Sequence, residues 1–223
     1  MIGTKRSPTQ ARGRMRRRIL LDAARALLET HDLDQLSLGN VAEHAGVPKG
    51  SAYHFFASIY ELYADLSRLI AEELRDGQLD PIEGPVTNWH MVLGVAIDRG
   101  AAFFNANTAA RQLILGPKSP PEIKRSDREA DYEIARSIEA QIGSHFVLPD
   151  IPERTVLFFR AVEIADLMFC LSVLDHGLIT PQMLEESKKA ALAYLSLYIP
   201  SFLTPAPAAS DPLTALADAA KAR

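Results

Sequence analysis

Apolar residues recur every three or four positions along nearly every part of this chain that has a regular pattern. Leu62, Leu66, Ile70 and Leu74 show this spacing clearly. An α-helix has 3.6 residues per turn, so residues spaced in this way lie on one face, whereas a strand would need strict alternation. No segment shows a convincing strand pattern. We therefore expect an all-α fold of about nine helices.

Prolines and glycines divide the helical segments into two groups. The segment "DGQLDPIEGPVT", residues 76–87, contains two prolines and two glycines and indicates a connector. We expect an N-terminal head in residues 1–76, a helical body in residues 77–203 and a mobile tail in residues 204–223, which are rich in alanine and proline. The chain has 223 residues and is 48% hydrophobic, which is enough for a packed core.

The helix boundaries follow from caps and breakers. Ser37 is a natural N-cap and Gly46 a natural stop. In the first helix we expect one face to contain Ile19, Ala23, Ala26, Leu27 and Thr30. The expected helices are 14–30, 38–45, 48–55, 58–76, 87–105, 108–115, 122–146, 153–176 and 181–199.

Charge is distributed unevenly along the chain. The formal net charge is -4, yet residues 1 to 21 carry seven arginine and lysine residues and no acidic residue. A positive end on a negative body favours a polyanionic partner, although a solvated tail would show the same pattern. The single cysteine, Cys170, excludes an intrachain disulfide, and no apolar run is long enough to span a membrane. We therefore expect a soluble, cytoplasmic protein.

The segment "GVPKGSAYHFF", residues 46–56, joins two strongly apolar helical patterns and is short and polar. Gly46 can adopt the left-handed conformation of a sharp turn, and Pro48 suits the first position of a helix. Gly50 costs a helix interior about 1 kcal/mol relative to alanine, but it would allow close approach to a groove wall. Two short helices joined in this way, with a third bracing them, predict a helix-turn-helix.

A longer stretch, "LSLGNVAEHAGVPKGSAYHFFASIYEL", resembles the DNA-binding segment of the TetR/AcrR family of bacterial regulators. The matching positions are Ser37, Val41-Ala42, Ala45-Gly46, Val47 to Tyr53, and Phe56. Two departures stand out: Ile59 replaces a common lysine at the start of the fourth helix, and Phe55 replaces a common histidine or tyrosine. The resemblance implies a dimeric, DNA-binding transcriptional regulator with a ligand-binding body.

The helix that begins near Pro48 is expected to enter the major groove of a double-stranded, palindromic operator. Lys49 would donate to guanine, Ser51 would meet several base edges, and Ala52 would touch a thymine methyl group. The resemblance implies that Ser37 and Tyr53 bind phosphates. Gly50 and His54 complete this surface, and the arginines expected along the DNA backbone are Arg14, Arg16, Arg17 and Arg18.

The sequence of the body predicts a dimer interface and a ligand-binding pocket. The last two long helices have an apolar excess, and the resemblance implies that they form the interface of a homodimer. A repressor released by a small apolar or amphipathic effector is the reading that the resemblance favours. Three charged side chains, Arg160, Glu163 and Asp166, lie in an otherwise apolar helix. Each of these charges needs an ion-pair partner, a cavity or an interface. The candidate ligand-binding residues are Trp89, Leu93, Phe104, Tyr132, Phe159 and Glu163.

Two other functions stay open from the sequence. An all-helical enzyme is disfavoured, because no His-Glu-x-x-His and no Glu-x-x-His motif is present. A ligand-independent, nucleoid-organising DNA-binding protein is the nearer alternative. No catalytic residue, cofactor or metal site is expected.

Overall fold

The computed structural model describes residues 8–207 and is all-α over that range, with a single isolated β-bridge. Nine α-helices lie in these residues, and the sixth continues into a π-helical turn. Their bounds are α1 Pro8–Leu27, α2 Leu38–His44, α3 Lys49–Phe55, α4 Ile59–Gln78, α5 Trp89–Ala106, α6 Thr108–Ala110, the π-helical turn η2 Arg111–Leu115, α7 Pro121–His145, α8 Arg154–His176 and α9 Pro181–Ser196.

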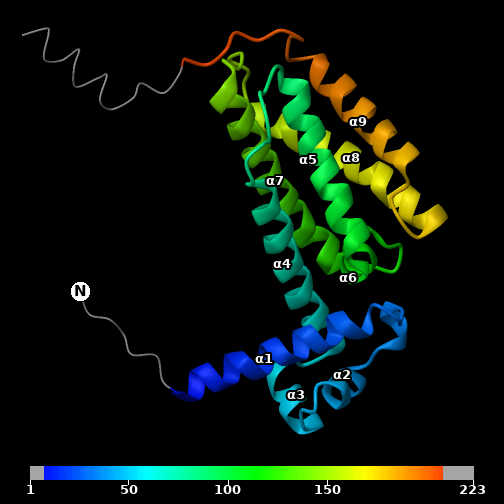
Figure 1. Cartoon of the computed structure of the whole chain (residues 1–223). Coiled ribbons are helices and arrows are strands. Elements are labelled where there is room, and N and C mark those ends of the chain that lie inside the picture. Colours follow the sequence, from blue (N-terminus) through cyan, green and yellow to red (C-terminus); the bar gives the residue numbers. More distant parts are fainter. Residues whose placement is uncertain (1–7, 208–223) are drawn as a thin grey trace, which may run out of the picture.

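Helices α1 to α3 pack around the first half of α4 and form the head, and the second half of α4 packs with α5 to α9 in the body (Figure 1). Helix α1 begins at Pro8, earlier than expected. The expected apolar face of α1 is only partly buried, because Ile19 and Ala26 are exposed whereas Leu20, Ala24 and Leu28 are fully buried. The larger leucines set the orientation of the helix because they bury more apolar area.

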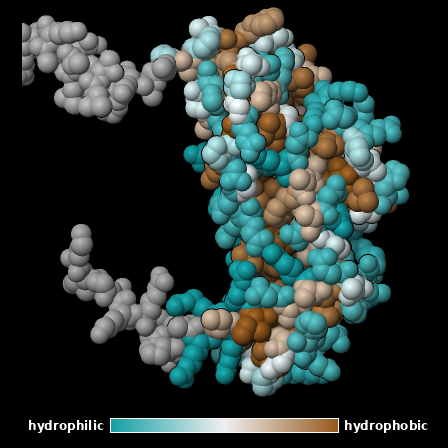
Figure 2. Space-filling view, in the orientation of Figure 1, coloured by the Kyte–Doolittle hydropathy of each residue, from teal (hydrophilic) through white to brown (hydrophobic). Residues whose placement is uncertain are grey.

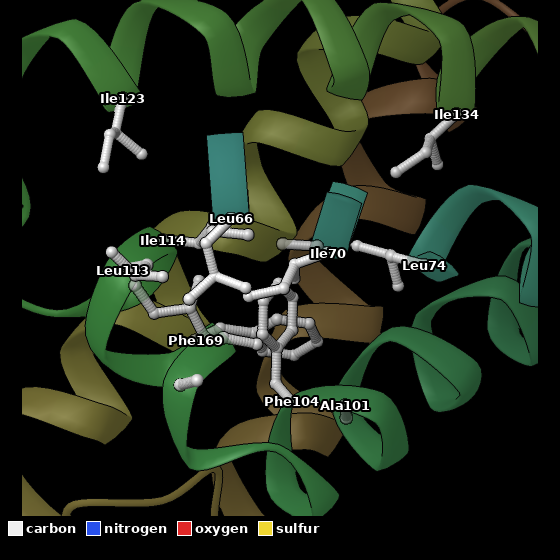
Figure 3. Close-up of a cluster of buried hydrophobic side chains, with 14 of the residues drawn as sticks. Leu66, Ile70, Leu74, Ala101, Phe104, Leu113, Ile114, Ile123, Ile134 and Phe169 are labelled. Atoms are coloured by element: carbon white, nitrogen blue, oxygen red, sulfur yellow. The ribbon is translucent and has the colours of Figure 1, made fainter. Parts of the chain in front are cut away.

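Helix α4 belongs to both parts of the molecule. Near its start, Leu62 and Tyr63 are buried in the head. Further along, Leu66, Ile70 and Leu74 point between the helices of the body (Figure 3). In the body their neighbours come from α5, η2, α7 and α8: Ala101, Phe104, Leu113, Ile114, Ile123, Ile134 and Phe169. One continuous apolar stripe therefore ties the head to the body.

A second connection between head and body is polar. The side-chain amide of Gln112, in η2, donates to the carbonyl oxygens of Leu28 and His31 at 2.9 Å each and accepts from the backbone N–H of Leu33 at 3.1 Å. Lys118 lies 2.8 Å from Asp34 and 3.1 Å from Asp32. The link between α1 and α2 is thus held by the segment that follows α5.

The caps of the helices explain their bounds. Ser37, Ser58 and Thr180 each accept the backbone N–H three residues on, and Asn88 does so with its side-chain oxygen. Gly46 has φ of 63°, as the sequence predicts for the turn after α2. Gly177 has φ of 74° and ends α8 in the same way.

The start of the expected C-terminal tail pairs with the end of α7. Val147 donates its backbone N–H to Thr204 at 2.8 Å, and Ala206 donates to His145 at 2.8 Å. Thr204 and Ala206 are therefore hydrogen-bonded to the end of α7 and to Val147, which follows it. Residues 208–223 lie outside the described residues.

The surface seen in Figure 2 is mainly hydrophilic, with apolar residues gathered in separate patches on the head and the body. Among the described helices, none combines the length and apolar character that a membrane crossing requires.

The buried hydroxyl of Tyr63 offers a test of the head's core. It donates to the carbonyl oxygen of Leu33 at 2.9 Å, and the Tyr63 ring is fully buried. Tyr63→Phe leaves that carbonyl without its donor, so we expect the free energy of unfolding to fall by about 1 kcal/mol. Tyr60 is 65% exposed, and Tyr60→Phe should change it by less than about 0.5 kcal/mol. Urea unfolding monitored by circular dichroism measures both values; equal effects would contradict this packing.

Candidate DNA-binding site

The turn between α2 and α3 holds the two helices at a fixed angle. Gly46 adopts the left-handed conformation, and the N–H of Val47 donates to the carbonyl of Ala42 at 2.9 Å. Val47 packs partly buried against the head's core. The geometry is that of the predicted helix-turn-helix, in which α3 is the second helix.

Helix α3 has one buried and one exposed face. Phe56 is 1% exposed, Phe55 is half-buried against the core, and Ala52 is fully buried. The expected contact between Ala52 and a thymine methyl group is therefore wrong, because the methyl group of Ala52 faces the core. Lys49, Gly50, Tyr53 and His54 are exposed and Ser51 is half-buried, so these residues form the outer surface of α3.

Gly50 has no role in the packing of the head. A β-carbon built at this position would meet no atom within 4 Å. The fold would accept a larger residue here, and the missing side chain leaves the backbone of α3 open to whatever approaches it.

Gly39 is a residue that the sequence reasoning missed. A β-carbon at Gly39 would lie 3.8 Å from Cε and Nζ of Lys49, which reaches back over α2. The ammonium of Lys49 is 4.0 Å from the carboxylate of Glu43. The signal in the sequence was a glycine inside a short helix, which is unfavourable without a packing reason.

Ser37 is exposed and is engaged by its own helix. Its hydroxyl accepts the N–H of Asn40 at 3.2 Å, and the side-chain oxygen of Asn40 accepts the N–H of Ser37 at 3.1 Å. This reciprocal capping fixes the start of α2. The Ser37 hydroxyl also donates its proton to the side-chain oxygen of Asn40 at 2.5 Å, so it would have to give up this bond to donate to a phosphate.

Arg17 takes a different place from the one expected. Its Nε donates to Asp65 at 2.6 Å, its Nη1 donates to the carbonyl of Phe55 at 3.3 Å, and its guanidinium lies 4.6 Å from the centre of the Phe56 ring. Arg17 therefore joins α1 to α3 and α4. No sequence pattern indicates this pairing, because Asp65 is distant along the chain.

The arginines near Arg17 in α1 face solvent, whereas Arg25, closer to its end, is partly buried and pairs with Glu73 at 2.9 Å. Arg14, Arg16 and Arg18 are exposed, and Nε of Arg18 pairs with Asp22 at 2.9 Å. Arg12, one turn earlier, is also exposed. Lys5 and Arg6 lie outside the described residues. Arg12, Arg14 and Arg16 are exposed and form no ion pair with a described residue, so their charges are available to a polyanion.

An apolar cavity lies in the body between α4, α5, α7 and α8, with a volume of about 40 Å³. Leu93 and Phe104 line it, as two of the six candidate ligand-binding residues. Trp89 is fully buried elsewhere in the core, and its Nε1 donates to the carbonyl of Pro200 at 2.8 Å. Tyr132 and Phe159 pack against each other between α7 and α8, with ring centres 5.8 Å apart. The predicted set is therefore spread over several places.

Glu163 lines a second, polar cleft of about 370 Å³ between η2, α7 and α8. It pairs with Arg128 at 3.2 Å. Asp127, Asp131 and Asp166 line the same cleft. Burial, together with the neighbouring carboxylates, raises the pKa of Asp131 to about 10 and that of Asp127 to about 6, and it raises the pKa of Asp166 well above its usual value.

Two family models match the chain. Residues 20–66 match "Bacterial regulatory proteins, tetR family", and residues 87–199 match "Tetracyclin repressor-like, C-terminal domain". No curated protein matches the sequence.

Solved structures of TetR-family regulators share the fold. A transcriptional regulator from Streptomyces coelicolor is 22% identical, with 83% of this chain and 98% of that chain covered and a TM-score of 0.65. One from Rhodococcus sp. RHA1 is 16% identical, with 82% and 96% covered and a TM-score of 0.61. A regulator described as putative, from Mesorhizobium loti, is 14% identical, with 83% and 98% covered and a TM-score of 0.58.

The matched head contains the helix-turn-helix, and the matched body contains α5 to α9. Regulators of this family bind DNA operators, dimerise through the C-terminal domain and are not enzymes. The last property agrees with the sequence-based expectation that the chain is not an all-helical enzyme. The chain belongs to the TetR family of DNA-binding transcriptional regulators.

Proposed function

We propose that this protein is a dimeric repressor that reads a palindromic operator with α3 of each protomer and leaves it when a small molecule binds the body. The observation that carries the proposal is the outer surface of α3. Lys49, Tyr53 and His54 are exposed there beside a glycine that the packing of the head does not require. Such a surface fits a major groove, where a helix needs donors and close backbone approach.

Exposed arginines support a role for α1 in positioning. Arg14, Arg16 and Arg18 would neutralise phosphates on either side of the groove, and Ser37 and Tyr53 would add hydrogen bonds to the backbone. Arg17 is excluded from this set, since its guanidinium is bound to Asp65. Its proposed role is to hold α1 against α3 and so to set the distance between the two contact surfaces.

The proposed dimer interface is the outer face of α8 with the end of α9. Leucines at positions 167, 171, 174 and 178 are spaced by four, three and four residues and are between 41% and 59% exposed. Leu197 and Phe202, after α9, are 75% and 94% exposed. An apolar stripe of this size needs a partner, and two copies of α8 and α9 would form a four-helix bundle.

Release by a ligand would act through the contacts between body and head. The apolar cavity holds about 40 Å³, so an organic ligand must widen it and displace the surrounding helices. Phe104 lines this cavity, and the segment that follows α5 carries Gln112, which binds the head. A ligand that favours the widened body would shift the head and lower operator affinity by the difference in its affinities for the two states.

Gly50→Ala separates folding from DNA recognition. The added methyl group meets no atom of the protein, so we expect the free energy of unfolding to stay the same or to rise by about 0.5 kcal/mol. Affinity for an operator, found by mapping bound chromosomal sites, should fall by about 10-fold because the methyl group holds α3 away from the groove. Fluorescence anisotropy measures it. Gly94→Ala, in the body and equally open, is the control; unchanged operator affinity in Gly50→Ala would contradict the proposed groove contact.

Substitutions of the arginines of α1 should have two different effects, one on DNA binding and one on stability. Replacing Arg14 and Arg16 by alanine should flatten the slope of log K against log salt by about two, with little effect on stability. Arg17→Ala should instead lower the free energy of unfolding by about 1–3 kcal/mol, since it leaves the buried Asp65 without its partner in α1. Salt titrations and urea unfolding measure the two effects. An unchanged slope for the double variant would refute the phosphate contacts.

Leu171→Glu should convert the dimer to monomers, because it places a charge in the proposed apolar interface. Sedimentation velocity at micromolar concentration measures the change. Leu79 is 60% exposed just after α4, and Leu79→Glu should leave the dimer intact. The proposed interface is wrong if the Leu171 variant sediments as a dimer, or if both variants dissociate equally.

A further inference from the structure

Three carboxylates meet between α7 and α8 in a way that the folding of the chain does not require. Asp127 and Asp131 lie one turn apart on α7, and Asp166 faces them from α8. One carboxylate oxygen from each residue lies within 4.8 Å of the other two. We call these three residues the acidic cluster.

Asp131 gives the strongest indication that the cluster holds a ligand. It is only 5% exposed, yet only burial and the charges of its neighbours act on its carboxyl group, and the nearby Arg128 pairs with Glu163 instead. It lines both the polar cleft and the apolar cavity behind it. A buried carboxylate without a partner costs several kcal/mol unless it is protonated or meets a cation.

The cations of the protein do not fill this role. Among the described residues that line the cleft, Lys124 and Arg128 are the basic ones. The guanidinium of Arg128 pairs with Glu163, and the charges of Arg128 and Lys124 act on Asp127 less strongly than its burial does, so neither side chain neutralises the cluster. Glu163 adds a fourth carboxylate to the same cleft. Cys170 also lines it, but its thiol is a soft ligand, which a cation that prefers oxygen does not require.

We propose that Asp127, Asp131 and Asp166 bind one divalent cation that prefers oxygen ligands, such as Mg²⁺, Mn²⁺ or Ca²⁺. The three donors are all carboxylates, which suit hard cations, and the open cleft of about 370 Å³ leaves room for water to complete the coordination shell. Two positive charges offset more of the cluster's charge than a single ammonium group would. The adjoining apolar cavity of about 40 Å³ has no room for the body of an organic amine.

The position of the cluster connects it to the rest of the molecule. Ile114 and Leu115 of η2 form part of the same cleft, and Gln112 in that turn binds the backbone of the head. A cation that draws α7 and α8 together would therefore act on the segment that holds the link between α1 and α2. This consequence depends on the proposed function, whereas the cation site itself does not.

Binding of Mn²⁺ to the full-length, DNA-free protein tests the site. The electron paramagnetic resonance signal of free Mn²⁺ should decrease on titration with wild-type protein, with one ion bound per chain. Asp131→Asn keeps the shape of the side chain but removes a ligand, so its affinity should be lower by at least about 10-fold. Glu129 is exposed on the same helix, and Glu129→Gln should bind Mn²⁺ like the wild type.

Thermal melting of the same proteins shows whether each variant is folded. Asp131→Asn should melt at or above the temperature of the metal-free wild type, because the amide can donate hydrogen bonds to the neighbouring carboxylates. Mn²⁺ and Ca²⁺ should raise the melting temperature of the wild type and of Glu129→Gln but not that of Asp131→Asn. Undiminished binding in a folded Asp131→Asn, or no binding to the wild type at millimolar Mn²⁺, would overturn the proposal. So would stabilisation at this site by hexylammonium and not by divalent cations.

Discussion

The apolar stripe of α4 is the constraint on which the structure depends. Its first turns complete the core of the head, and Leu66, Ile70 and Leu74 complete the core of the body (Figure 3). Since a packed core resists continuous deformation, a change in the body must either move α4 as a rigid element or break one of the cores. The hydrogen bonds from Gln112 to the link between α1 and α2 attach the head to the body at a second point. Two points of attachment fix the orientation of the head relative to the body, whereas one alone would not.

Buried charge is handled in two opposite ways along the molecule. In the head, Asp65 is buried and fully engaged by Arg17 and Arg68, so it strengthens the frame that presents α3. In the body, Asp131 is buried and has no partner among the described residues. A satisfied carboxylate stabilises one arrangement, whereas an unsatisfied one makes stability depend on what binds. The head, which binds DNA, is therefore the more rigid part, and the body, where a ligand would bind, is the part whose stability depends on what is bound.

The sequence was sufficient for features that depend on local chemistry. The all-α class, the cap at Ser37 and the left-handed turn at Gly46 all follow from residue type and spacing, and the structure confirms them. It was insufficient where partners are distant in the chain. The pairing of Arg17 with Asp65 and the burial of Ala52 depend on how α1, α3 and α4 cross, and the cluster of Asp127 and Asp131 with Asp166 depends on how α7 meets α8. Periodicity also misjudged the orientation of α1, because several faces of that helix carry apolar residues.

Two copies of the exposed face of α3 are proposed to read one specific DNA sequence together. Selection of duplexes from a random library by the purified wild-type protein should therefore enrich an inverted repeat whose half-site centres are separated by one helical turn, about 34–36 Å, or a multiple of it. A recovered pool that stays random after repeated rounds, although the protein retains duplexes at low salt, would instead identify a protein that coats DNA without reading its sequence.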